Sequence, residues 1–167
     1  MPSQDYEEFI GALNAHGVRY LVIDAHTVAF HARPRATKDL DILLEPTAEN
    51  AHRALAALRE FFGDADLGYT VDDLINPRWI VQLGIAPIRI DLLSGIPRIT
   101  DFEAVWRNRV DAYFGTVSVH YLGLDDLLQA KEAAGKPQDR ADVRVLQRAK
   151  GKVQSTQRSS RRSSRSR

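Results

Sequence analysis

Residues 39–44, DLDILL, combine the apolar content of a buried strand with two acids at alternate positions. In a strand, residues two apart point to the same face, so the carboxylates of Asp39 and Asp41 project side by side. Like charges placed that closely repel and raise each other's pKa, unless a cation lies between them. The segment therefore predicts a cation site on one face of a sheet, or a simpler arrangement in which one acid caps the strand end and the other faces solvent.

The rest of the chain alternates helical and strand patterns around this segment. We expect strands at 18–23, 39–44, 79–83, 87–93 and 115–121, and helices at 3–16, 25–32, 48–62, 101–107, 124–134 and 138 to about 150. Residues 84–87 are consistent with a hairpin, and residues 63–73 with a polar, exposed loop. This order indicates an α/β (α+β) domain in which helices pack on a mixed β-sheet and a helical pair closes the C-terminal part.

Length and composition bound the class of protein. The chain has 167 residues, of which 44% are hydrophobic and 27% charged, as in one ordinary globular domain. The absence of cysteine excludes disulfides and thiolate metal sites and is compatible with a reducing cytoplasm. The N-terminal residues lack the pattern of a signal peptide, and no apolar run approaches the roughly 20 residues that span a bilayer. We therefore expect a cytoplasmic protein with no membrane association.

Charge divides the chain into two parts. Residues 150–167 carry seven Lys and Arg and no acid, whereas residues 1–149 carry 16 basic and 22 acidic residues. Only Val153 is a large apolar residue in this Arg/Ser-rich tail, so we predict a domain at 1–149 and a disordered basic tail at 150–167. The tail has three alternatives: attachment to RNA or DNA through its charge, contact with an acidic partner, or no function.

A third acid strengthens the prediction of a cation site. Asp91 lies in IRIDLL, where apolar residues again alternate as in a strand. Three carboxylates in or beside strands bind Mg²⁺, or Mn²⁺ in its place, through hard oxygen ligands that the strands hold in position. Two such ions align an attacking oxygen and a phosphoryl leaving group, so the pattern favours phosphoryl transfer chemistry.

The stretch YLVIDAHTVAFHARPRATKDLDILLEP, together with PIRIDLLSG, resembles the minimal nucleotidyltransferase superfamily, which has a polymerase-β-like fold. Within it the resemblance is to small bacterial proteins of toxin-antitoxin type, and it covers roughly residues 5–149. The positions that match the pattern are Arg35, Thr37, Asp39, Asp41, Asp91, Lys131, Lys136, Asp139 and Asp142.

This resemblance implies transfer of a nucleoside monophosphate from an NTP to an unidentified acceptor, which is RNA, a protein or a small molecule. It implies Mg²⁺ bound by Asp39, Asp41 and Asp91, with Asp91 assisting in deprotonation of the acceptor hydroxyl. Arg35, Thr37 and the preceding turn are implied to bind the nucleotide. RNA or a cognate toxin or antitoxin is the further partner that such proteins have.

The turn at residues 24–25 departs from the pattern. Relatives have Gly-Gly or Gly-Ser there, which lets backbone N–H groups at a helix N-terminus hold the triphosphate, whereas this chain has Asp24-Ala25. Either Asp24 caps the following helix, or nucleotide binding is weakened and the protein is a catalytically degenerate binding or regulatory module of antitoxin type. His26, next in the chain, donates to a phosphate or packs locally.

The charged residues of the C-terminal segment that match the pattern each have two alternative roles. Lys131 and Lys136 contact phosphate or are solvated helix charges. Asp139 and Asp142 support these lysines or cap the last helix.

Overall fold

The computed structural model describes residues 4–32, 39–85 and 87–163, and it contains a six-stranded mixed sheet with the strand order β3-β4-β2-β1-β6-β5. The strands are β1 (Tyr20–Ile23), β2 (Asp39–Leu44), β3 (Ile80–Ile85), β4 (Ile88–Leu93), β5 (Val110–Phe114) and β6 (Val117–Tyr121). Strand β2 runs antiparallel to β1 and parallel to β4, whereas β3 and β4 form the expected antiparallel hairpin. The mixed α/β fold that the sequence predicts is confirmed.

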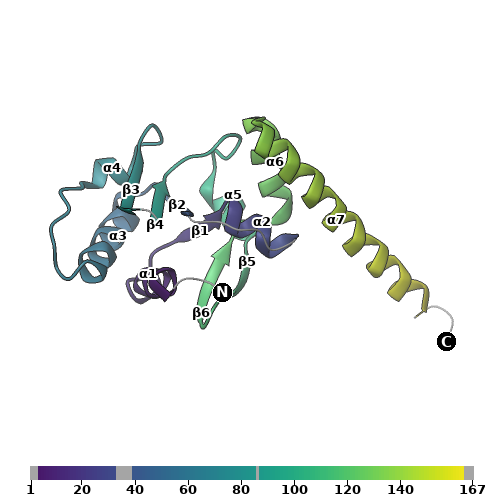
Figure 1. Cartoon of the computed structure of the whole chain (residues 1–167), viewed down its shortest axis with the longest axis horizontal. Helices are drawn as coiled ribbons and strands as arrows, with labels where there is room; N and C mark the ends of the chain where they lie inside the picture. Colours follow the sequence, from purple (N-terminus) through teal and green to yellow (C-terminus); the bar gives the residue numbers. More distant parts are fainter. Residues whose placement is uncertain (1–3, 33–38, 86, 164–167) are drawn as a thin grey trace.

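Seven helices accompany the sheet among the described residues (Figure 1). They are α1 (Gln4–Ala15), α2 (Ala25–His31), α3 (Ala48–Phe61), α4 (Val71–Ile75), α5 (Phe102–Arg107), α6 (Leu124–Ala134) and α7 (Pro137–Ser163). Helices α1 and α3 pack on one face over a core that includes Phe9, Tyr20 and Ile42. A second core, which includes Leu21, Leu43 and Leu146, lies on the opposite face beneath α2, α5, α6 and α7.

Alternation along the strands sends the acids to the second of these faces. In β2, Leu40 and Ile42 enter the first core, so Asp39 and Asp41 point with Leu43 toward the other side. In β4 the same alternation places Asp91 on the face of Leu93. The acids therefore share the face of the sheet that α2, α6 and α7 approach.

Two short elements fall where the sequence predicts none. Strand β5 pairs antiparallel with β6 at the edge of the sheet. Helix α4 lies in part of the predicted polar loop and begins with a capping box, in which Thr70 and Asp73 bond each other's backbone N–H groups.

The predicted disordered tail is helical in the structure as far as Ser163. Helix α7 continues through Lys150 without a break and projects away from the rest of the molecule (Figure 1). Residues 151–162 are exposed, so packing does not explain the helix. Residues 137–150 have already formed the costly nucleus, and each further Arg, Lys or Gln adds a hydrogen bond at little cost in helix propensity.

Within the described ranges, none of the helices combines the length and the apolar content that a bilayer crossing requires.

Candidate active site

Three acids meet on adjacent strands at the centre of the sheet. The parallel register of β2 and β4 pairs Asp41 directly with Asp91 and pairs Asp39 with Arg89. Neighbouring strands lie about 4.8 Å apart, so the carboxylates of Asp41 and Asp91 are immediate neighbours. The antiparallel register with β1 places Ile23 opposite Asp41. The next residue, Asp24, therefore lies at the end of β1, close to Asp41. The predicted trio of acids is therefore assembled, together with Asp24.

The charge on Asp41 is costly in this setting. Burial raises the pKa of Asp41, and the negative charges of Asp24, Asp91 and Asp39 raise it further, to about 7, although Lys131 acts in the opposite direction. A carboxyl with this pKa is largely ionised only above neutral pH. A bound cation would remove the repulsion and restore the ionised form.

Two neighbours of the acids lie on β3 and β4 and were not predicted. Arg89 donates from its guanidinium to Asp39 at 2.8 Å, and its Nε lies 3.8 Å from Asp91. Gln82 donates to Asp91 at 3.2 Å. Both residues occur in the sequence at positions that alternate with core residues. Their contacts depend on strand register, which the sequence does not give.

The turn before α2 holds Asp24 in a conformation that suits glycine. Its φ of 64° and ψ of −137° lie in a region that non-glycine residues seldom occupy, at a cost of about 1–3 kcal/mol. The side chain forms no capping hydrogen bond with α2, so the capping alternative is not what the structure adopts. The backbone of Asp24 therefore has the geometry of a glycine turn, whereas its side chain does not cap α2.

The buried amine of Lys131 pairs with the carboxylate of Asp24. The amine of this lysine, which is 6% exposed, donates to Asp24 and Asp139 and forms an ion pair with Asp142 at 3.1 Å. Burial alone would lower the pKa of Lys131, but the bonds and charge of Asp24, and the bonds with Asp142 and Asp139, raise it. This lysine therefore stays charged and links α6, the start of α7 and the turn before α2.

Asp139 and Asp142 of α7 both support Lys131, as one predicted alternative has it, and Asp139 also caps the helix, as the other has it. Asp139 accepts from the Lys131 amine and also from the backbone N–H of Lys136 at the start of the helix. Asp142 accepts from Gln138 besides its pairing with Lys131. Lys136 itself is exposed, and no ion pair connects its side chain to an acid in the described ranges. Of the two predicted lysines, only Lys131 reaches the site.

His26 packs between aromatic rings. Its ring centroid lies 5.7 Å from that of Tyr6 and 5.3 Å from that of Phe114. Its Nε2 is buried and has no hydrogen-bond partner among the residues that the structure describes. Burial lowers the pKa of His26 against the opposing effect of Asp39, so the ring is neutral at pH 7. Ala25 is buried at the first position of α2.

The donor set suits a hard divalent cation in its chemistry. Asp39, Asp41 and Asp91 offer only carboxylate oxygens, and the raised pKa of Asp41 reflects negative charge that a cation would balance. Arg89 already balances part of it. As the side chains stand, no group of three or more His, Cys, Asp or Glu residues in the described part of the chain is arranged to hold a metal ion. Arg35 and Thr37, the other predicted nucleotide ligands, lie outside the described residues.

An apolar hollow adjoins the charged cluster. It has a volume of about 100 Å³, opens to solvent, and has a lining that consists of Ile23, Asp24, Ile96, Pro97, Leu122, Leu127, Ala130, Lys131, Ala134 and Asp139. Its wall is therefore apolar on one side and charged where Asp24 and Lys131 meet.

Comparisons with known proteins agree on the type of fold. A family described as "Nucleotidyl transferase of unknown function (DUF2204)" matches residues 2–165. A crystal structure of a candidate nucleotidyltransferase from Thermotoga maritima matches with a TM-score of 0.56 and 16% sequence identity, over 86% of this chain and 93% of that one. At this identity the match shows a shared fold and nothing finer. A search of curated proteins gives no match.

Proposed function

The chain belongs to this nucleotidyltransferase family, and we propose that it transfers a nucleoside monophosphate from an NTP to an acceptor hydroxyl with the help of Mg²⁺, so that the α-phosphorus loses its bond to pyrophosphate as it bonds to the acceptor oxygen. The observation that carries the proposal is the assembly of Asp39, Asp41 and Asp91 on neighbouring strands. The raised pKa of Asp41 supports it, because a chain gains nothing in stability from such a cluster without a cation.

In this proposal Asp39, Asp41 and Asp91 would hold Mg²⁺, or Mn²⁺ in its place. When bound, the ion would neutralise charge on the phosphates and polarise the phosphorus centre. Asp91, 15% exposed and next to Asp41, accepts the proton of the attacking hydroxyl. Arg89 exchanges Asp39 for a phosphate oxygen, for which its guanidinium has suitable geometry. The apolar hollow beside Asp24 offers the nucleobase a surface away from water.

Transfer of label tests this proposal. Each α-³²P-labelled NTP is incubated with Mg²⁺, the protein and candidate acceptors of the three classes, namely RNA, protein and small hydroxyl compounds. We expect label on an acceptor with the native chain and a loss of at least 100-fold with Asp39→Asn or Asp41→Asn. Glu132→Gln, on the exposed surface of α6, is the matched control. Transfer that survives both aspartate changes would show that the site lies elsewhere.

A second candidate function rests on a different observation. The carboxylate of Asp24 is held by Lys131 at the turn where a triphosphate would bind, and its charge repels phosphate. In this alternative the protein is a catalytically inactive module that binds a partner, as an antitoxin does. The expected sign is weak binding of Mg-ATP and Mg-GTP to the native chain.

Asp24→Gly separates the two candidates. Glycine adopts the observed φ of 64° without strain and removes the charge that opposes phosphate. If the module is degenerate at this turn, nucleotide affinity in isothermal titration rises at least tenfold. Equal affinities for the two proteins would eliminate Asp24 as the cause of weak binding, whether or not transfer is observed.

A further inference from the structure

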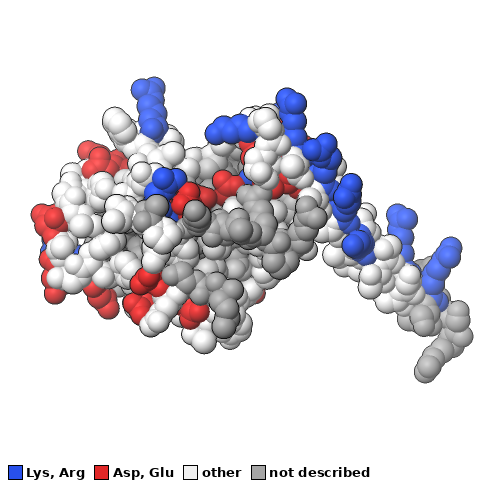
Figure 2. Space-filling view, viewed as in Figure 1, with Lys and Arg blue, Asp and Glu red and all other residues white. Residues whose placement is uncertain are grey.

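One side of α7 is basic along its whole described length. After Asp139 and Asp142 the helix contains no acid. The exposed cations of this basic stripe are Arg140, Arg144, Arg148, Lys152 and Arg158. Figure 2 shows blue side chains following α7 outward, whereas red and blue are mixed on the visible surface of the body. The excess of positive over negative charge is therefore concentrated on one projecting helix.

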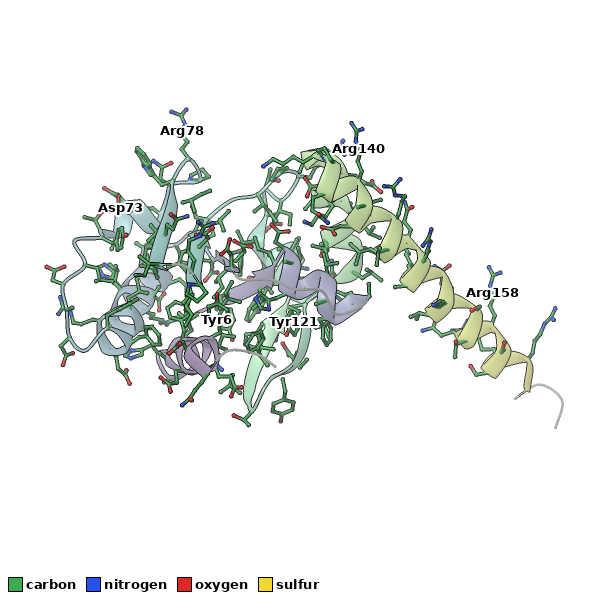
Figure 3. The ribbon with its side chains drawn as sticks, in the orientation of Figure 1. Tyr6, Asp73, Arg78, Tyr121, Arg140 and Arg158 are labelled. Carbon is green, nitrogen blue, oxygen red and sulfur yellow. The ribbon has the colours of Figure 1, made fainter. Side chains whose placement is uncertain are left out.

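Helical geometry places these cations on one broad side of α7. Arg140 and Arg158 are 18 residues apart, which is five turns of 3.6 residues, so both face the same way, about 27 Å apart. Figure 3 shows the two side chains projecting from the same side of α7, away from the body. Between them, Arg144, Arg148 and Lys152 follow at intervals of four residues, or about 6 Å. The result is a row of positive charges that winds over about 120° of the helix circumference.

No internal acid neutralises this row. Within the described ranges, none of the five cations forms an ion pair, whereas Lys150, on another side of the helix, is paired with Asp125 at 2.6 Å. Like charges four residues apart on a helix repel each other, so the row destabilises the helix that carries it. A polyanion with regularly repeated charge would remove that repulsion.

We propose that the basic stripe of α7 binds RNA along its phosphate backbone. A membrane surface is a poorer fit, because an interfacial helix needs a continuous apolar face and Val153 is the only exposed large apolar residue of α7 among the described residues. Between the cations stand side chains that accept hydrogen bonds, among them Gln147, Ser155 and Thr156, of which the two hydroxyls already donate to the backbone carbonyl of Lys152. Such groups recognise the 2′-hydroxyl that distinguishes RNA from DNA.

The stripe begins beside the candidate active site. Arg140 directly follows Asp139, which bonds to Lys131, and Lys131 contacts Asp24 at the turn before α2. RNA bound along α7 therefore has one end at the end of the helix where Asp139 contacts Lys131. On the proposed function, this makes RNA the acceptor class. RNA binding by α7 does not itself depend on catalysis.

Fluorescence anisotropy of a labelled single-stranded 20-nucleotide RNA, without NTP or Mg²⁺, tests the stripe separately from the reaction. Five phosphate contacts predict a slope of about −3.5 for log K against log salt, or a loss of roughly 100-fold in affinity between 50 and 200 mM salt. The triple variant Arg144→Gln, Arg148→Gln, Arg158→Gln should reduce the slope to about −1.4. Gln keeps a good helix propensity, which circular dichroism verifies.

Matched controls decide the outcome. A second triple variant, Arg59→Gln, Arg78→Gln, Arg107→Gln, removes the same charge from exposed positions outside α7 and should leave RNA affinity unchanged within about twofold. Absence of RNA binding by the native chain, or equal weakening by both triple variants, would overturn the proposal. Equal or tighter binding of DNA of the same sequence, or of polyglutamate as an acidic protein mimic, would also overturn it.

Failure of the stripe and failure of the active site have different signatures. If RNA binds and the α7 variant loses it, the inference stands even where no label transfer occurs. If label passes to a protein or small molecule but RNA does not bind, the proposed function survives and the stripe does not.

Discussion

Replacing Asp41 by Asn should stabilise the protein at alkaline pH. In the folded state the pKa of Asp41 is raised from 3.8 to about 7 by burial and by the charges of Asp24, Asp91 and Asp39. Between these two values the folded chain binds more protons than the unfolded chain, so the free energy of unfolding decreases as pH rises from about 4 to about 7. Asn is nearly isosteric with Asp and carries no charge. The variant therefore does not lose this part of the free energy of unfolding as pH rises.

The size of the effect follows from the shift. A shift of about 3 pKa units corresponds to about 4 kcal/mol once Asp41 is fully ionised. Asp41 is not completely buried, and solvent screening reduces this value by about half. We therefore expect Asp41→Asn to raise the free energy of unfolding by about 2 kcal/mol at pH 8 and by only about 0.5 kcal/mol at pH 4.5. The increase at pH 8 corresponds to roughly 4–8 °C in Tm.

Urea unfolding at both pH values, in buffer with EDTA, measures the difference. Glu132→Gln exchanges an exposed carboxylate of α6 for an amide and should shift stability by less than about 0.5 kcal/mol at either pH. Addition of Mg²⁺ at pH 8 should stabilise the native chain and not Asp41→Asn. A variant that is equally stable or less stable than the native chain at pH 8 would refute the electrostatic account of the cluster.

Other perturbations examine the helices around the site. Lys131→Met leaves buried carboxylates without their cation and should cost about 3–5 kcal/mol at pH 7, measured by urea unfolding; a loss below about 1 kcal/mol would contradict the pairing. Leu146→Ala, at a fully buried position of α7, should cost about 2–5 kcal/mol by calorimetry, and a cost below 1 kcal/mol would place α7 outside the core. Ending the chain after Gly151 removes residues that are exposed over 152–162 and should change Tm by less than about 3 °C, whereas a larger fall would reveal contacts of the tail with the body.

The central part of the fold could be predicted because its signals are strong and local. The strand 39–44 has the predicted bounds, and helix 124–134 ends at the predicted residue, where Gly135 adopts a φ of 65° as helix C-caps do. Strand β5 was missed because it is an edge strand with exposed Asp111 and Tyr113, so its apolar pattern is weak. Helix α4 was missed because it is only five residues long, although its capping residues are visible in the sequence.

The candidate site also has a part that the sequence predicts and a part that it does not. That Asp39 and Asp41 share a face follows from strand periodicity alone. The contact of Asp24 with Lys131 joins residues 107 positions apart, and that of Arg89 with Asp39 joins residues 50 apart. Such contacts depend on helix packing and strand register, which a single sequence does not determine. Composition also misled for residues 150–163, because it reports whether a segment can bury a core and not whether an existing helix can continue.

On the proposed function, the bond between Lys131 and Asp24 would couple nucleotide binding to the placement of the C-terminal helices. Lys131 is anchored to α7 through Asp139 and Asp142, so a triphosphate that takes the place of Asp24 contacts the same amine that holds α6 and α7 together. By thermodynamic linkage, whatever factor a bound nucleotide imposes on the affinity of α7 for a ligand, that ligand imposes on nucleotide affinity. A molecule bound along the outer helix would thus regulate the turn at residue 24 from a distance.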